Sequence, residues 1–286
     1  MVNKPPTTAL VLTGGGGLGA IQVGMLRELL AVGEKFDFVV GASAGAINGA
    51  FFATNPTCEG VAALEKIWRM ITRRDVMPLS FGSLINVLRR RDYIVDGSAL
   101  RRLLDRHLGN SLIETTVLPL HIVTTELLSG DEIVLSNGPM VQAVLASAAI
   151  PGIFPPVPIN GRLLIDGGIA NNAPISAAIM RGAERIVLLP TGFACVPKSL
   201  SPGAAAKAMH AVNLLVSRQL VRDIGHYAAR ADICVVPTLC PLEASSYDYS
   251  ACASLIDRAA DCTRDWIKAG GLQSTGIPPM LHEHTH

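Results

Sequence analysis

The chain has 286 residues, and its 24 Lys and Arg nearly balance 23 Asp and Glu, for a net charge of +1. This balance excludes a strongly basic nucleic-acid-binding protein, and a hydrophobic content of 49% excludes intrinsic disorder. Charged residues make up only 16% of the chain, against roughly 25% in a typical soluble domain.

The first 54 residues contain two units of strand, turn and helix. Residues 9–12 form an apolar run that ends in glycines, and residues 20–32 place large apolar side chains on one helical stripe. A second apolar run at residues 36–40 leads into a small-residue helix that ends near Thr54. Two such units in succession predict a parallel sheet with helical crossovers.

The same alternation continues toward the C-terminus. We expect further strands at 118–125, 133–135, 185–189 and 233–236, and helices from 175, within 204–231 and at 251–268. A single α/β domain over residues 7–270, followed by a tail at 271–286, is the domain organisation that fits this pattern.

The segment at residues 58–108 differs from the rest, because it holds ten Lys and Arg against six Asp and Glu. We expect a helical cap within the domain, whose charges either form a solvated face or touch an anionic lipid surface. An apolar run that includes Met77, Pro78, Leu79 and Phe81 adds the hypothesis that residues 73–108 form a lid.

Three segments carry no charge: Pro5–Leu26, Phe38–Cys58 and Ile133–Gly161. Each has the length of a bilayer span, about 20 residues, but glycines, Asn48 and prolines interrupt them. We expect a cytoplasmic protein, peripheral to a membrane at most, without a spanning or export segment. A parallel sheet buried on both faces explains the uncharged runs.

A G-x-S-x-G pattern occurs once, at Gly41–Gly45, between an expected strand and an expected helix. In that context the serine is a nucleophile on a tight turn, and the flanking Gly41 and Gly45 leave room for the turn. Ser43 is therefore the candidate nucleophile, and an ordinary N-cap serine is the alternative.

A run of glycines, Gly14–Gly17 with Gly19, also lies between a strand and a helix. Backbone N–H groups exposed at such a place bind an anion. They predict either an oxyanion hole beside Ser43 or a dinucleotide site, since Gly14, Gly16 and Gly19 fit G-x-G-x-x-G. The dinucleotide interpretation lacks the acid expected at the end of the next strand, because Asp37 stands at that strand's start.

A serine nucleophile needs a base, and the chain offers two kinds. His210 or His226 would complete a Ser–His–Asp set, yet both lie in a helical stretch without a glycine-rich loop. Asp166 follows an apolar strand and precedes Gly167 and Gly168, which clear space around its carboxylate. An ordinary Asp-Gly turn is the alternative there.

No metal or cofactor site is expected. None of the six cysteines forms a C-x-x-C pair, so free thiols are the expectation for a reducing compartment. His282, His284 and His286 belong to a terminus that we expect to be frayed.

Four ordered blocks together resemble the patatin-like phospholipases. They are Thr13–Ala20, Gly41–Gly45, Ser147–Pro151 with Phe154–Pro156, and Asp166–Gly168 with Asn172 and Pro174; Tyr247–Tyr249 is similar to short bacterial members. The resemblance covers residues 7–192 firmly and the rest loosely. It implies a three-layer α/β/α sandwich with a mostly parallel central sheet.

The resemblance implies a Ser43–Asp166 dyad without histidine, which hydrolyses phospholipids or other fatty acyl esters. The implied oxyanion hole consists of Gly14, Gly15, Gly16 and Gly17, and the supporting motif glycines are Gly19, Gly41, Gly45, Gly167 and Gly168. A base for serine needs a pKa above that of a free aspartate, so Asp166 should be buried among apolar groups.

Leu18 stands where the family usually has Arg or Lys. We therefore predict an acyl ester hydrolase of lipid-like substrates rather than a strict phospholipase. Two other functions stay open: a nucleotide-binding protein that uses Gly14–Gly19, and a catalytically silent lipid-binding scaffold of the same fold. A lipid or acyl ester is the predicted partner, nucleic acid is not, and the oligomeric state is left open.

Overall fold

The computed structural model describes residues 5–78, 93–192, 203–240, 242 and 244–275. Its strands form one eight-stranded sheet. Five adjacent strands are parallel: β8 (Asp232–Val235), β7 (Arg185–Leu189), β1 (Thr8–Leu12), β2 (Phe38–Ala42) and β3 (Leu120–Glu126). Antiparallel strands complete it: β4 (Glu132–Leu135), β5 (Val157–Ile159) and β6 (Arg162–Asp166).

Strands β1 and β2 are buried along their whole length, which explains why their sequence carries no charge. Alternate residues face opposite sides of the sheet, so Leu10 and Leu12 join one hydrophobic core while Ala9 and Val11 join another. The uncharged runs around these strands are thus interior strands of a two-faced sheet.

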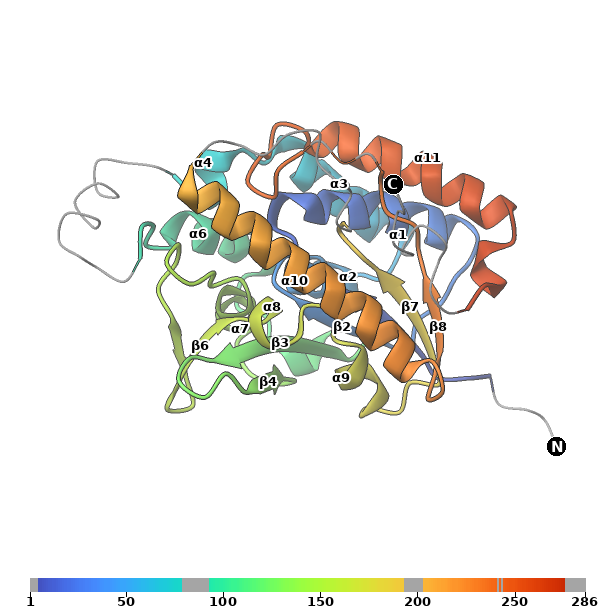
Figure 1. Cartoon of the computed structure of the whole chain (residues 1–286), viewed down its shortest axis with the longest axis horizontal. Coiled ribbons are helices and arrows are strands. Elements are labelled where there is room, and N and C mark those ends of the chain that lie inside the picture. Colours follow the sequence, from blue (N-terminus) through green and yellow to red (C-terminus); the bar gives the residue numbers. More distant parts are fainter. Residues whose placement is uncertain (1–4, 79–92, 193–202, 241, 243, 276–286) are drawn as a thin grey trace.

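Helices cover both faces of the sheet (Figure 1). One face packs against α1 (Gly19–Ala31), α2 (Ala44–Thr54), α3 (Cys58–Met70), α6 (Ser98–Leu108), α7 (Met140–Ser147) and α11 (Cys252–Lys268). The other face packs against α9 (Ile175–Ile179) and α10 (Ala204–Tyr227). The predicted three-layer α/β/α sandwich with a mostly parallel sheet is confirmed.

Short helices join these elements: η1 (Gly16–Leu18), α4 (Arg73–Val76), η2 (Ile113–Thr115), α8 (Gly168–Asn171) and η3 (Gly271–Gln273). The expected tail begins as η3, where Gly271 is buried. Strand β5 was not expected from the sequence, because prolines surround and interrupt it, and proline weakens the signal of a strand.

Strand β3 brings two distant segments together. It pairs with β4 along residues 122–125, so β4 occupies one edge of β3. The other edge pairs first with β2, up to Ala42 opposite Val123, and then with β6, from Asp166 opposite Thr124. Strands β2 and β6 therefore meet end to end along one edge of β3, and their ends carry Ser43 and Asp166.

The segment at residues 58–108 contributes α3, α4 and α6, with residues 79–92 outside the described part of the chain. The buried side chains of α3, which are Val61, Leu64 and Trp68, belong to the main hydrophobic core. Met77 is buried, whereas Leu79 and Phe81 of the same apolar run lie outside the described residues. A lid at residues 73–108 stays a prediction.

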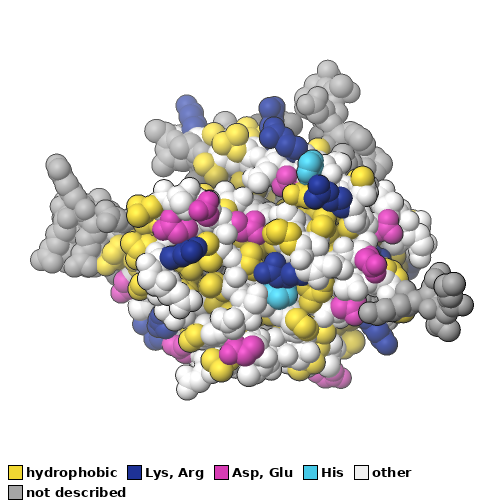
Figure 2. Space-filling model, turned by 90° about the horizontal axis from the view of Figure 1, so that it is seen from below, with side chains coloured by type: hydrophobic (Ala, Val, Ile, Leu, Met, Phe, Trp, Pro, Cys, Tyr) yellow, Lys and Arg dark blue, Asp and Glu magenta, His cyan; other side chains and the backbone are white. Residues whose placement is uncertain are grey.

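Among the helices that the structure describes, none combines the length and the apolar character needed to cross a bilayer. Figure 2 shows acidic and basic side chains interspersed with apolar ones on the face of the molecule seen from below. No single-sign stripe of the kind that binds nucleic acid gathers on that face.

Candidate active site

Ser43 lies on a strained turn between β2 and α2. Its φ of 53° and ψ of −122° are unusual for a residue with a side chain and cost of order 1–3 kcal/mol. The flanking glycines permit the turn: a Cβ atom on Gly41 would overlap the carbonyl of Gly45, and one on Gly45 would overlap the carbonyl of Leu12. This explains the spacing G-x-S-x-G in physical terms.

Asp166 lies against Ser43 at the end of β6. The Ser43 hydroxyl donates a hydrogen bond to Asp166 Oδ2, with an O···O distance of 2.6 Å. The other carboxylate oxygen, Oδ1, accepts the N–H of Gly168 at 2.7 Å. A Cβ atom on Gly167 would overlap the Val123 carbonyl, so glycine is needed where the chain turns away from the sheet.

Both side chains of this pair are only 6% exposed. Burial raises the pKa of Asp166 from its ordinary 3.8 to about 6, although the hydrogen bonds from Ser43 and Gly168 oppose that rise. The predicted buried environment of Asp166 is confirmed. An aspartate with this pKa is ionised at neutral pH and is a better proton acceptor than a solvated one.

Ser147, which sequence reasoning had assigned no role, ties the two residues together. Its hydroxyl accepts the N–H of Ser43 at 2.9 Å and donates to the carbonyl of Val123 at 2.6 Å. Its own carbonyl accepts the N–H of Gly167 at 3.1 Å. The fully buried Ser147 therefore fixes the backbone on both sides of the Ser43–Asp166 bond.

The glycine-rich loop follows β1 and passes beside Ser43, since a Cβ atom on Gly14 would lie 3.0 Å from the Ser43 Cβ. Two of its N–H groups bond to the protein itself: Gly14 donates to the Asn172 carbonyl at 3.2 Å, and Gly17 to the Ser246 carbonyl at 2.7 Å. In the described part of the chain, the N–H groups of Gly15 and Gly16 have no acceptor.

Thr191, which the sequence analysis did not predict, also holds the glycine-rich loop in place. Thr191, which follows β7, donates its hydroxyl to the Gly14 carbonyl at 2.6 Å. Its N–H bonds to the hydroxyl of Thr13 at 3.0 Å. A Cβ atom on Gly15 would overlap the Thr191 side chain, so the loop approaches β7 as closely as glycine allows.

Three buried side chains extend this support to α3. Gln22 donates to the carbonyls of Thr13 and Leu189, both at 2.9 Å. Asn48 donates to the Gln22 side chain at 2.8 Å and accepts the indole N–H of Trp68 at 2.8 Å. The only signal for this network in the sequence is two amides, Gln22 and Asn48, each flanked by apolar and small residues.

An apolar cavity adjoins Ser43. Its walls include Ile47 and Phe51 of α2, Leu64 and Trp68 of α3, and Leu100 and Leu104 of α6. Gly16 and Ser43 form part of its surface, and Tyr247 and Tyr249 are the other described lining residues that carry a hydroxyl group. The hydroxyl of Ser43 thus lies at the edge of a site suited to an aliphatic chain.

A model of the patatin-like phospholipase family matches residues 10–179, which include Ser43, Asp166 and the glycine-rich loop. The chain belongs to the patatin-like phospholipase family. Patatin-like phospholipase domain-containing protein 7 of Rattus norvegicus is 30% identical over 186 residues, which are 64% of this chain and 13% of that protein. An uncharacterized NTE family protein of Mycobacterium tuberculosis is 32% identical over 203 residues, 68% of this chain and 33% of that protein.

The chain therefore matches between about an eighth and a third of the length of these relatives. Among solved structures, ExoU of Pseudomonas aeruginosa in its complex with SpcU aligns with a TM-score of 0.50 and 18% identity. The alignment covers 95% of this chain and 54% of the other. At this level of identity the likeness supports a patatin-like fold.

Leu18 is the main departure of this patatin-like chain from the pattern of its family. Its side chain is buried, 8% exposed, in the main hydrophobic core. The glycine-rich loop at residues 14–19 therefore carries no positively charged side chain.

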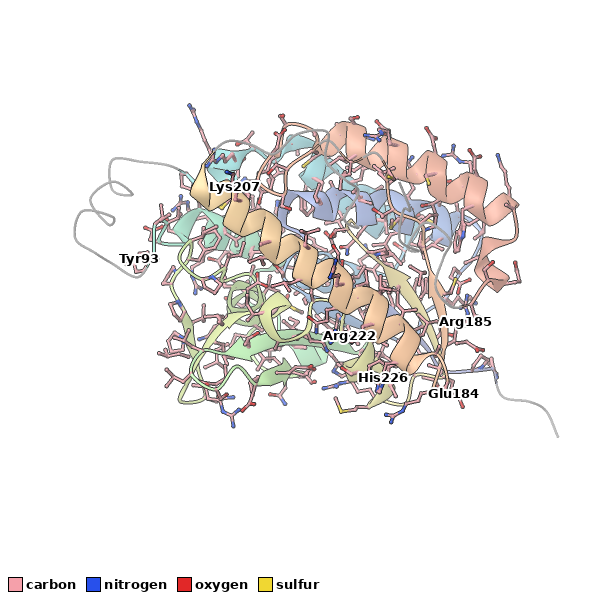
Figure 3. All side chains as sticks on the ribbon, in the orientation of Figure 1. Tyr93, Glu184, Arg185, Lys207, Arg222 and His226 are labelled. Carbon is pink, nitrogen blue, oxygen red and sulfur yellow. The ribbon has the colours of Figure 1, made fainter. Side chains whose placement is uncertain are left out.

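Of the two histidine alternatives for the base, the one whose side chain the structure describes, His226, lies away from Ser43. His226 lies in the last turn of α10, just before the chain enters β8 at the amino end of the parallel strands, the end at which Figure 3 labels Arg185. Its ring packs on Tyr227 at 4.6 Å. The side chain of His210 lies outside the described part of the molecule. Asp166 is the titratable side chain that the described structure places on Ser43.

The alternative that the glycine-rich loop binds a nucleotide requires an acidic residue at the end of β2, and Asp37 does not lie there. Asp37 accepts the N–H of Thr8 at 2.7 Å, at the opposite end of β1 from the glycines. Within the described residues, no group of three or more His, Cys, Asp or Glu side chains has the arrangement of a metal site.

Proposed function

We propose that this protein is a serine hydrolase of fatty acyl esters, with Ser43 as nucleophile and Asp166 as base. The observation that carries the proposal is the 2.6 Å bond between the Ser43 hydroxyl and the buried Asp166 carboxylate, beside an apolar cavity. Membership of the patatin-like phospholipase family supports a lipid as the substrate.

The proposed reaction has two steps. Ser43 Oγ attacks the ester carbonyl carbon while Asp166 takes the hydroxyl proton, and the carbon–oxygen bond to the alcohol then breaks as Asp166 returns that proton to the alcohol. Water next attacks the acyl-enzyme, Asp166 accepts a proton from the water, and the proton returns to Ser43 as the fatty acid leaves.

The negative oxygen of each tetrahedral intermediate needs hydrogen-bond donors. Of the four glycines predicted to supply them, Gly15 and Gly16 have N–H groups without a described acceptor, and Gly16 borders the cavity beside Ser43. We assign the oxyanion to these two donors. Gly14 and Gly17 then serve to hold the loop in shape through their bonds to Asn172 and Ser246.

The cavity supports a substrate with an acyl chain that runs along α2. Ile47 and Phe51 follow Ser43 by four and eight residues, so the helical rise places Phe51 about 12 Å along the helix from Ser43. The Phe51 ring lines the cavity and lies tilted against the His107 ring, with 5.9 Å between the ring centroids.

Labelling with a fluorophosphonate probe tests the proposal, because the probe reacts with an activated serine and not with an ordinary one. Wild type should be labelled and should hydrolyse a fatty acyl ester, and Ser43→Ala should do neither. Ser129→Ala removes an exposed serine in the β3–β4 turn and is the matched control. A wild type without labelling or hydrolysis would instead favour the catalytically silent lipid-binding scaffold.

A further inference from the structure

A second hollow opens beside the acyl cavity, between the start of α4 and the loop at residues 245–250. Three residues line both hollows: Ile71, Tyr247 and Tyr249. The two spaces therefore adjoin, and a molecule whose acyl chain fills the first would extend its other end toward the second. We refer to the second hollow as the polar recess.

The polar recess differs from the cavity in charge. Arg73 is the basic residue and Asp248 the acidic residue on its described lining, and the described lining of the acyl cavity has neither kind. The Arg73 guanidinium makes no hydrogen bond or ion pair with another described residue, whereas the nearby Arg69 pairs with Glu65 and Asp257. Arg73 is exposed, and none of the described residues occupies its guanidinium.

Asp248 is held in its ionised form by its own loop. One carboxylate oxygen accepts the N–H and the hydroxyl of Ser250, at 3.0 and 2.6 Å, and these bonds lower the pKa of Asp248. Tyr247 lines both hollows, and burial first and then the charge of Asp166 raise the pKa of its phenol. The recess therefore presents one positive and one negative group at the exit of the active site.

We propose that the polar recess binds the zwitterionic head group of a phospholipid substrate, with the phosphate on Arg73 and the alkylammonium on Asp248. This assignment rests on the proposed function, since it places the other end of the molecule whose ester Ser43 attacks. Guanidinium groups bind phosphate through charge-assisted, often bidentate hydrogen bonds. An alkylammonium group is attracted both to a carboxylate and to the face of an aromatic ring such as that of Tyr247.

The assignment also accounts for Leu18. The glycine-rich loop offers no cation because Leu18 is buried in the core. Arg73, which belongs to a separate helix, supplies a positive charge on the same side of the site. Phosphate recognition in this chain would then depend on α4 and not on the glycine-rich loop.

The test compares three lipids with identical acyl chains in neutral detergent micelles: phosphatidylcholine, phosphatidylglycerol and diacylglycerol. Arg73→Gln should lower kcat/KM for both phospholipids by about 10- to 100-fold, as expected for loss of a hydrogen bond to a charged group. Its kcat/KM for diacylglycerol should stay within roughly twofold of wild type. Arg74→Gln, which changes an adjacent exposed arginine outside the recess, is the matched control and should behave as wild type.

The second variant tests the contact with the alkylammonium group independently of the contact with the phosphate. Asp248→Asn keeps an acceptor for Ser250, and it should slow phosphatidylcholine hydrolysis by about tenfold while leaving phosphatidylglycerol and diacylglycerol unchanged. The proposal is overturned if Arg73→Gln slows all three lipids equally or none of them. It is also overturned if Asp248→Asn does not distinguish choline from glycerol.

Inorganic phosphate is the final probe, because a free phosphate has the same chemistry as the head group. A head-group site leaves diacylglycerol hydrolysis by wild type insensitive to added phosphate. If added phosphate inhibits diacylglycerol hydrolysis by wild type but not by Arg73→Gln, the recess is a site for free phosphate, and the head-group assignment is overturned. If the wild type hydrolyses no ester at all, both the proposed function and the head-group assignment are overturned. If the variants hydrolyse the three lipids in the same ratios as wild type, only the head-group assignment is overturned.

Discussion

Replacement of Asp166 by Asn should inactivate the protein and stabilise it. Burial raises the pKa of Asp166 from 3.8 to about 6. A difference of about two pKa units, at roughly 1.4 kcal/mol each, means that folding disfavours the ionised carboxylate by about 3 kcal/mol. Asparagine keeps an oxygen for the Gly168 N–H and removes the charge. Asp166→Asn should therefore raise the free energy of unfolding near neutral pH, with no ester hydrolysis.

The pH dependence of this gain follows from its cause. Because the pKa of Asp166 is higher in the folded state than in the unfolded state, the folded protein binds the extra proton between about pH 3.8 and 6. Ionisation of Asp166 thus reduces the free energy of unfolding as pH rises through this window, and the reduction is complete above it. The gain of the variant over wild type should be about 3 kcal/mol near pH 7.5 and only about 1.5 kcal/mol near pH 5.

Urea unfolding of the two proteins at both pH values measures this difference. Asp131→Asn, which changes an exposed aspartate next to the β3–β4 turn, is the control and should give the same free energy of unfolding as wild type at both pH values. The reasoning fails if Asp166→Asn is no more stable than wild type near pH 7.5. It also fails if the gain is as large near pH 5.

Three further predictions concern activity. Ester hydrolysis by wild type should rise about tenfold per pH unit below pH 6 and level off above it, because Asp166 must be ionised to accept the Ser43 proton; a flat pH–rate profile would contradict this. Phe51→Ala should shift the preferred acyl chain to longer esters, measured as kcat/KM over a series of chain lengths, whereas an unchanged optimum would place the end of the chain elsewhere. Trp68→Phe leaves the buried Asn48 oxygen unpaired, so it should lower the free energy of unfolding in urea by about 1–3 kcal/mol. It should also lower kcat more than it raises KM, and an effect on KM alone would show that Trp68 does not support the glycine-rich loop.

Sequence alone locates Ser43 and the glycine-rich loop because both depend on local chemistry. A tight strand-to-helix turn requires glycine at fixed positions, and an apolar run before it marks the strand. Asp166 is harder, since it lies 123 residues beyond Ser43. The pairing of Asp166 with Ser43 follows from the resemblance to the patatin-like family. The contact between the two side chains depends on β2 and β6 meeting end to end along β3.

The residues that hold the site were not predicted, for a physical reason. Ser147, Thr191, Gln22 and Asn48 act through hydrogen bonds to backbone groups of other elements, so no spacing in the sequence marks them. Once the structure is known, these four residues share one property: each is an uncharged polar side chain within or beside an apolar run. Buried polar side chains must find partners, which makes such residues candidates for fixing a loop.

Three features that each cost stability coincide at Ser43. The turn holds a non-glycine residue at positive φ, the adjacent carboxylate is desolvated, and the N–H groups of Gly15 and Gly16 have no acceptor in the described protein. A serine that merely began a helix would need none of them, and a lipid-binding scaffold would need only the cavity. Their combination matches what acyl transfer requires, which is a projecting nucleophile, a base of raised pKa and free donors for an oxyanion. It is this coincidence, more than any one motif, that favours an active hydrolase over a silent relative of the same fold.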